Sequence, residues 1–389
     1  MRGKTEVVPL AALVCGAISF LTPFAALKEN RVVDGIMATG ADLAGDWILA
    51  FSIILGFSVL LAALFIPSGR VRRLIYAIAG SACIWISAAL LVRGGARLPS
   101  GVAPRVSPAI GFWGLPAASY ILIIHSHIVR KRREKWIMGL VLLLPMVLIF
   151  SSGRGDSISV YREWTARRAR FLNETLAHAR LFVTAVLSAT LIGIPLGILA
   201  SRSRRYTTLV IGFVDTAQTI PSMALFGLLM APLAALSRAY PAFRAMGIRG
   251  VGAAPALIAL TLYALLPIVR NTVTGLASVP AASLDAGRGM GMSPRQLFYR
   301  VKWPTALPHV LTGLRTASVQ GVGNTAVAAL IGAGGLGIMI FQGLGQAAPD
   351  LILLGVLPLI LMAFITDRGW DYIIQCCVSP GLRLPGNER

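Results

Sequence analysis

The chain alternates between long apolar runs and short polar or basic segments. A helix needs about 20 mostly apolar residues to cross a bilayer, and most of the runs are close to that length. The pattern therefore predicts an all-α polytopic membrane protein with about ten transmembrane helices. The expected helices are Pro9–Leu27, Trp47–Pro67, Leu74–Val92, Pro108–Val129, Trp136–Phe150, Leu181–Ala200, Thr207–Leu236, Ala253–Arg270, Thr305–Leu330 and Asp350–Ile374.

Two of the expected spans have unusual lengths. Trp136–Phe150 is short, so it must thin the bilayer locally or extend into its polar flanks. Thr207–Leu236 is long and contains Pro221 and Pro232, so we expect a kink or a break within it. Basic residues precede the first apolar run as they do in a signal peptide. That run is long and its cleavage-like site is weak, so we expect an uncleaved first span.

The composition supports a membrane protein. The 389 residues are 56% hydrophobic and 13% charged, whereas soluble domains are less apolar and carry more charge. This excludes a disordered chain, a collagen-like fibre and an ordinary cytosolic enzyme. The net charge of +21 comes from basic clusters between apolar runs. Such clusters are typical of cytoplasmic loops beside a lipid bilayer, so no nucleic-acid partner is expected, and they favour both termini inside.

The chain divides into regions of different character. The expected regions are an N-terminal membrane region of about five helices (1–150), an outer linker (151–180), a core (181–375) and a cytoplasmic tail (376–389). In the linker, arginines are interleaved with Tyr161, Trp164 and Phe171, which favours an amphipathic helix on the outer interface over a solvated basic loop. The motifs lie in the core, so we expect residues 1–150 to stand outside the conducting part.

The longest expected cytoplasmic loop contains residues 279–304. Pro280 suits the start of a helix, and Gly291 is placed to end it. Ser293 and Gln296 then form a capping box for a second helix. The loop is therefore predicted to be a helix, a glycine turn and a helix. On these grounds alone it is either a docking element for a soluble partner or an interfacial connector.

The loop sequence Asp285-Ala286-Gly287-x3-Gly291-x9-Val301-x-Trp303-Pro304 resembles the "EAA" loop of ABC importer permeases, E-A-A-x3-G-x9-I-x-L-P. The spacings, the glycine and the proline match, whereas Asp, Gly, Val and Trp replace the family's Glu, second Ala, Ile and Leu. The resemblance implies a coupling helix that sits in a groove of the ATPase subunit. The residues expected to couple to the ATPase are Asp285, Ala286, Gly287, Gly291, Val301 and Pro304.

Other stretches are similar to the glycine betaine/carnitine/choline permeases. They are 218–222, 263–272, 289–292 and 329–337, and the first five spans resemble the extended N-terminus of the Yeh-type osmoprotectant permeases. The resemblance implies a C-terminal five-helix type I ABC importer core in a bacterial inner membrane. It also implies a second permease copy or paralogue, ABC ATPase subunits and a binding protein, which we expect to be a separate chain.

The resemblance implies a transport permease and not an enzyme. No G-x-x-x-x-G-K-[ST] phosphate loop occurs in the sequence, so ATP is expected to bind the partner subunit. We assign no catalytic residue, no cofactor and no metal site to this chain. The rival functions are an ABC permease for another small solute, an ion-coupled secondary transporter that uses Asp215, and a membrane scaffold without transport.

Charged residues inside expected spans are costly and often functional. Asp215 and Arg315 lie at similar depths in their spans, so we expect a structural pair, with a cation waypoint at Asp215 as the alternative.

Gln218, Pro221, Asn324 and Thr325 are candidates for a polar translocation path, because irregular backbone is tolerated where it borders a cavity. A packed proline kink is the alternative. The tract Gly332–Gly345 is too rich in glycine for a rigid helix and is expected to form either an outer gate or a packed turn.

Overall fold

The computed structural model describes residues 2–30, 34–45, 53, 70–98, 104–126, 144 and 147–382. The chain divides into two compact units. The N-terminal unit contains Met1–Ala166 together with Ala348–Asp350, and the C-terminal unit contains Arg167–Ala347 and Leu351–Arg389. Nearly all of the expected span Trp47–Pro67 and most of Trp136–Phe150 lie outside the described residues.

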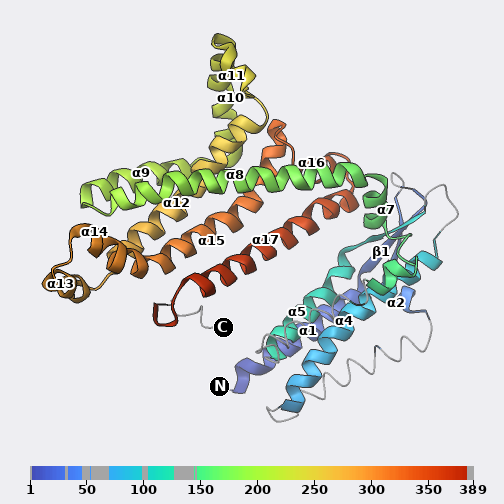
Figure 1. Ribbon diagram of the computed structural model, residues 1–389. Helices are drawn as coiled ribbons and strands as arrows, with labels where there is room; N and C mark the ends of the chain where they lie inside the picture. The colour runs from blue at the N-terminus through green and yellow to red at the C-terminus, as the bar shows by residue number, and fades with distance from the viewer. Residues whose placement is uncertain are drawn as a thin grey trace. The chain divides into compact units, whose positions relative to one another are not determined.

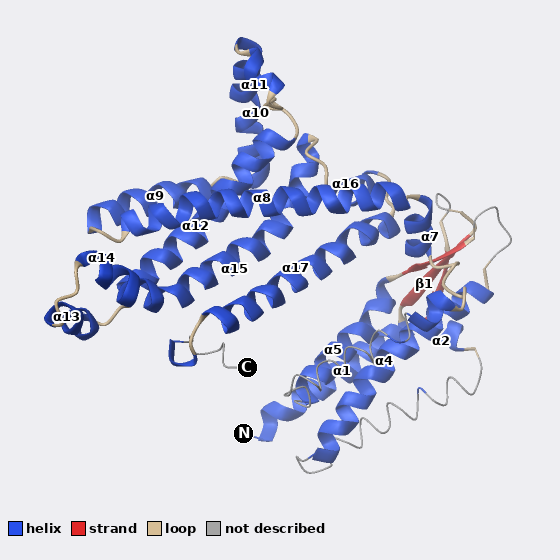
Figure 2. Ribbon diagram, viewed as in Figure 1, coloured by secondary structure: helices blue, strands red, loops and turns tan. Residues whose placement is uncertain are grey.

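The N-terminal unit combines helices with a small sheet. Its elements are α1 (Arg2–Leu21), β1 (Pro23–Lys28), β2 (Ile36–Thr39), α2 (Gly40–Ala44), α4 (Arg70–Ala96), β3 (Arg105–Pro108), η1 (Ile110–Trp113), α5 (Gly114–Ser126) and α7 (Ser159–Ala166). Helix α5 packs against α1 and α4. The strands form an antiparallel sheet in the order β2-β1-β3 (Figure 2). Phe24, Leu90 and Leu115 are fully buried in the shared core.

The described chain is predominantly helical, as the all-α expectation requires, and this small three-stranded sheet is a local departure from it. The first span was expected to run to Leu27, but α1 ends at Leu21 and β1 begins at Pro23. The residue before a proline disfavours the helical conformation, which explains the end of the helix. The strand was missed because Phe24–Leu27 is buried throughout and shows no polar alternation. A short apolar run of this kind is compatible with either a helix or a strand.

The described residues of the C-terminal unit form helices joined by turns and short loops, with no strand among them. Its elements are α8 (Arg168–Ala200), α9 (Arg204–Thr219), α10 (Ser222–Ala239), α11 (Pro241–Ala245), α12 (Ala253–Ala277), α13 (Ala281–Gly289), α14 (Pro294–Leu297), the π turn η2 (Phe298–Lys302), α15 (Trp303–Val327), η3 (Ala328–Ile331), α16 (Gly337–Gly345), α17 (Pro349–Cys377) and η4 (Pro380–Leu382). The first turn of α17 is counted with the N-terminal unit.

Helix α12 lies at the centre of this unit. It packs against α8, α9, α15 and the first turns of α10, while the rest of α10 and α11 project away from these helices (Figure 1). The contacts are close because glycines face them. A Cβ atom on Gly197 would lie 2.6 Å from Thr272 Cβ, and one on Gly313 would lie 2.7 Å from the Pro267 carbonyl. Small residues at such contacts let membrane helices approach through van der Waals packing.

Five described helices are long and apolar enough to cross a membrane. They are Val71–Ala96, Arg168–Ala200, Ser222–Ala239, Ala253–Ala277 and Pro349–Cys377. They overlap expected spans, whereas the expected total of about ten is not established by the described residues. The amphipathic helix expected in the linker 151–180 is not a single separate helix in the structure. Residues 168–180 are the beginning of α8 and continue directly into the span, so only α7 is a separate short helix.

The long expected span Thr207–Leu236 is broken, as predicted. Helix α9 ends at Thr219 and α10 begins at Ser222, with Ile220 and Pro221 in extended conformations between them. Pro232 lies inside α10, which continues through it.

Candidate functional site

The loop 279–304 has the predicted helix, turn and helix. Helix α13 ends at Gly289, and Gly291 follows with φ +77°, a left-handed conformation that glycine adopts without steric cost. Ser293 caps α14. Its hydroxyl accepts from the Gln296 N–H at 3.3 Å, and the Gln296 side chain accepts from the Ser293 N–H at 2.8 Å. The predicted capping box is therefore confirmed.

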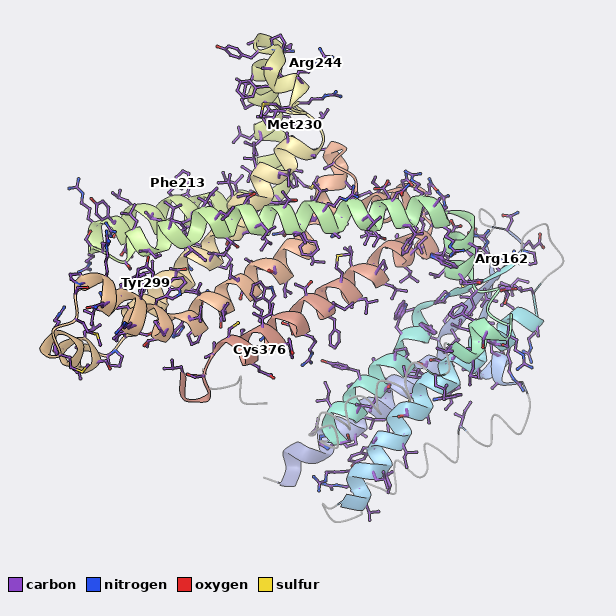
Figure 3. The ribbon with its side chains drawn as sticks, in the orientation of Figure 1. Arg162, Phe213, Met230, Arg244, Tyr299 and Cys376 are labelled. Atoms are coloured by element: carbon purple, nitrogen blue, oxygen red, sulfur yellow. The ribbon has the colours of Figure 1, made fainter. Side chains whose placement is uncertain are left out.

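Helix α13 is held by its glycine face and exposes its charged face. Gly287 is buried, and a Cβ atom there would lie 2.6 Å from Leu297 Cδ1. Asp285 and Ala286 are exposed, and Asp285 pairs with Arg288 at 2.9 Å. Figure 1 shows α13 beyond the ends of α12 and α15, and Tyr299 is exposed nearby in Figure 3. The result is a supported protrusion with an exposed surface.

The other two loop residues lie where the chain returns to the bundle. Val301 and Pro304 are half-buried. The Val301 carbonyl accepts the Thr305 hydroxyl at 2.8 Å, so the π turn leads into α15 without an interruption.

The break between α9 and α10 is joined to α12 by two reciprocal hydrogen bonds. The Gln218 amide donates to the Tyr263 carbonyl oxygen at 2.6 Å, and the Tyr263 hydroxyl donates to the Ile220 carbonyl oxygen at 2.6 Å. The Tyr263 carbonyl needs such a donor because Pro267, four residues later, has no N–H. Gln218 thus replaces a missing helical bond, and Tyr263 satisfies a carbonyl at the break.

The remaining candidates of the polar path lie on α15. The Thr325 side chain is buried, and its hydroxyl donates to the Gly321 carbonyl of the same helix at 2.7 Å. Asn324 is half-buried. Within the described residues, no hydrogen bond joins Gln218 to Asn324 or Thr325. The four candidates are therefore not gathered into one hydrogen-bonded cluster.

The predicted pair between Asp215 and Arg315 is wrong, because each residue has another partner. Asp215 pairs with Arg270 of α12 at 3.0 Å, and both side chains are about half exposed (49% and 52%). Arg315 pairs with two carboxylates of α17, Asp367 at 2.7 Å and Asp371 at 2.5 Å. Similar depth in the sequence does not determine which helix faces meet. Positions i and i+4 share a helix face, so the two acids reach one guanidinium.

The glycine segment, residues 332–345, forms a packed turn followed by a short helix. Gly332, Gly334 and Gly335 have positive φ, and the Gly335 N–H donates to a Glu174 carboxylate oxygen at 2.8 Å. His178 is fully buried against this turn. Its Nε2 lies 3.0 Å from the Val322 carbonyl oxygen.

Several residues of these sites were missed in the sequence. Glu174, Asp367 and Asp371 were not named in the sequence analysis, and Tyr263 and Arg270 were included only as part of the stretch 263–272, without their contacts. A usable signal existed for three of them. Tyr263 lies four residues before a proline, and Asp367 and Asp371 lie four residues apart within an expected span. In the described part of the chain, no group of three or more His, Cys, Asp or Glu residues could hold a metal ion.

Comparisons with known proteins give two family matches and several similar permeases. Residues 193–375 match the family model "Binding-protein-dependent transport system inner membrane component", and residues 3–161 match "ABC transporter permease YehY, N-terminal domain". The osmoprotectant import permease protein OsmW of Salmonella typhimurium is 42% identical over 50% of this chain and 85% of its own length. The glycine betaine/carnitine/choline transport system permease protein OpuCD of Bacillus subtilis is 38% identical, over 56% of this chain and 87% of its own length. In a solved structure of the MetNI methionine ABC transporter, one chain aligns with a TM-score of 0.48 at 21% identity, covering 55% of this chain and 99% of that one.

The helical core and the loop 279–304, together with these matches, define a permease subunit of an ABC importer. It is a transport protein and not an enzyme, and it works with a separate ATPase subunit and a substrate-binding protein. The chain belongs to the family of binding-protein-dependent transport system inner membrane components, in the group of osmoprotectant permeases.

Proposed function

We propose that this chain carries quaternary-ammonium osmoprotectants such as glycine betaine or choline in an ATP-driven importer. The observation that carries the proposal is the identity of 42% and 38% to permeases named for osmoprotectant and glycine betaine/carnitine/choline transport. Selectivity would lie mainly in the binding protein, where aromatic rings can surround a quaternary ammonium. The permease would then need only a polar path.

We infer that α13 docks in a groove of the ATPase subunit. Its exposed Asp285 and Ala286 support this inference, as does the rigid seat that Gly287 and Leu297 provide. A rigid element transmits a push from the ATPase, whereas a flexible loop would absorb it. A second permease copy would receive the other ATPase subunit. The distribution of Lys and Arg favours N-in and C-in, which places α13 on the cytoplasmic side with the ATPase.

We also infer that the translocation path lies in residues 181–375 and passes the break between α9 and α10. Gln218, Pro221, Asn324 and Thr325 are its candidate residues. The break supports this inference, because irregular backbone is tolerated at membrane depth where it is buried or borders a cavity. Alternating access would then require the two bonds between Gln218, Tyr263 and Ile220 to persist or to exchange during the cycle.

Uptake into proteoliposomes tests the proposal. The vesicles contain this chain, its ATPase and its binding protein, and labelled glycine betaine and choline are supplied outside. We expect the labelled solute to accumulate only when ATP is present on the side of the membrane that carries the ATPase. Accumulation should stop when the binding protein is omitted. Uptake driven by an ion gradient without the ATPase would favour a secondary carrier. ATP-driven uptake of another solute, with neither glycine betaine nor choline carried, would contradict the substrate class.

A further inference from the structure

An aspartate from near the end of the chain is built into the N-terminal unit. Asp350, in the first turn of α17, is only 4% exposed, and both of its carboxylate oxygens accept hydroxyl hydrogen bonds. Ser107 donates to Oδ2 at 2.9 Å, and Ser159 donates to Oδ1 at 2.6 Å. The two serines are themselves buried, at 4% and 0% exposure. A buried carboxylate is stable only when hydrogen bonds or charges compensate it, and these two bonds do so.

The two serines sit on elements that are fixed to each other. Ser107 lies in β3 and Ser159 begins α7. The Val106 N–H donates to the Ser157 carbonyl at 2.8 Å. An ion pair between the half-buried Arg105 and the buried Glu163, at 2.9 Å, joins the same two elements. The two serines that bind Asp350 are therefore held in place by the surrounding structure and are not exposed side chains in chance contact.

The turn just before Asp350 is strained. Ala347 has φ +46°, and it is the one non-glycine residue with positive φ among those that the structure describes. Alanine adopts this conformation only where its surroundings impose it. Ala348, directly after it, is 7% exposed and belongs to the N-terminal unit. The strained turn between α16 and α17 therefore lies directly before the residues that the N-terminal unit holds.

We propose that the N-terminal unit positions the start of α17 for transport, through a joint formed by Ser107, Ser159 and Asp350. The proposal rests on the ATP-driven import inferred above. It gives the extended N-terminal region a role in the cycle, since α17 also holds Arg315 through Asp367 and Asp371. These three residues are positioning residues, and they do not contact the transported solute.

The first test compares uptake with ATP hydrolysis in the same proteoliposomes. The variants are Asp350→Ala and the double variant Ser107→Ala with Ser159→Ala. We expect uptake per ATP hydrolysed to fall by about tenfold, as the loss of buried hydrogen bonds implies. Ser107→Thr with Ser159→Thr keeps both hydroxyls and is expected to restore much of the ratio. Ser151→Ala is the matched control, because that hydroxyl is exposed and bonds only within its own turn. Reduced amounts of protein with an unchanged ratio would overturn the positioning role.

The second test needs no transport. Ala348→Cys is introduced into a chain whose four native cysteines are replaced by serine, and its alkylation rate is measured in membranes. We expect slow alkylation with the joint intact and at least about tenfold faster alkylation with Asp350→Ala. If Asp350→Ala does not accumulate in membranes, the alkylation rate is measured instead with Asp350→Asn and with the single variant Ser159→Ala. Faster alkylation in a system that shows no ATP-driven uptake would support the joint and reject the proposed function. An unchanged alkylation rate would reject the joint.

Discussion

Gln218 and Tyr263 each satisfy a backbone carbonyl that the other's segment leaves free. The Gln218 amide donates to the Tyr263 carbonyl, which lacks its helical donor because residue 267 is proline. The Tyr263 hydroxyl donates to the Ile220 carbonyl at the end of α9. In lipid, an unpaired backbone group costs several kcal/mol, so this exchange allows the helix to break inside a membrane.

Removing the Tyr263 hydroxyl tests this relationship. Tyr263→Phe keeps the ring and leaves the Ile220 carbonyl without a donor, so we expect a loss of about 1–3 kcal/mol in the free energy of unfolding. Tyr240→Phe is the matched control, since Tyr240 is 58% exposed. Thermal melting in detergent measures both variants. Equal melting temperatures for Tyr263→Phe and the unmodified protein would show that the bond contributes nothing.

Alanine substitutions at two glycines of α13, one buried and one exposed, test whether the contact between α13 and Leu297 is needed for transport. Gly287→Ala would place a Cβ atom 2.6 Å from Leu297 Cδ1, whereas a Cβ atom on Gly289 would meet nothing within 4 Å. The close atom is the end of the Leu297 side chain, which must change rotamer, so we expect Gly287→Ala to cost about 1 kcal/mol, the low end for overpacking, and to lower ATP-driven uptake a few-fold. Gly289→Ala is expected to leave uptake near normal. Equal uptake by the two variants would contradict the importance of this seat.

The features that the sequence predicted correctly are local ones. The capping box at Ser293, the turn at Gly291 and the break at Pro221 each depend on residues within one or two helical turns. Backbone chemistry at such distances is the same in any fold, so the residue types were sufficient.

The features that were missed depend on which faces meet. The partner of Arg315 is chosen by the packing of α15 and α17, and depth along a span carries no information about it. Strand β1 was hidden because its residues are buried on both faces and so lack an alternating pattern. The hydrogen bond from Gln218 to Tyr263 could be predicted only in part from the sequence. Pro267 shows that the Tyr263 carbonyl lacks its helical donor, but not which side chain supplies a replacement.

We expect the two ion pairs of the C-terminal unit to contribute unequally to the free energy of unfolding. Arg315→Gln would leave Asp367 and Asp371 without their shared cation, and these side chains are 32% and 24% exposed. We expect a loss of about 2–3 kcal/mol, below the 3–5 kcal/mol of a fully buried pair. Asp215→Asn breaks a pair that is half exposed, so we expect a loss of at most about 1 kcal/mol.

A compensating variant checks that account. Adding Asp367→Asn and Asp371→Asn to Arg315→Gln removes the two carboxylates that shared the guanidinium, of which only Asp371 has a second cation, Arg368 at 3.7 Å, among the described residues, so part of the lost melting temperature should return. A triple variant no more stable than Arg315→Gln would mean that the guanidinium acts through packing and not through charge.

Gly337 and Gly345, at the two ends of α16, predict opposite outcomes for the same substitution. A Cβ atom on Gly337 would lie 1.8 Å from the Ala326 carbonyl oxygen, and a backbone atom cannot rotate away. Gly337→Ala must therefore separate α16 from α15, and we expect a loss of at least about 3 kcal/mol with faster proteolysis in membranes. A Cβ atom on Gly345 would meet nothing within 4 Å. Gly345→Ala is expected to raise stability by up to about 1 kcal/mol, because alanine favours a helix over glycine. Melting temperatures and protease sensitivity of the two variants decide the matter, and a stable Gly337→Ala protein would exclude the close contact between α16 and α15.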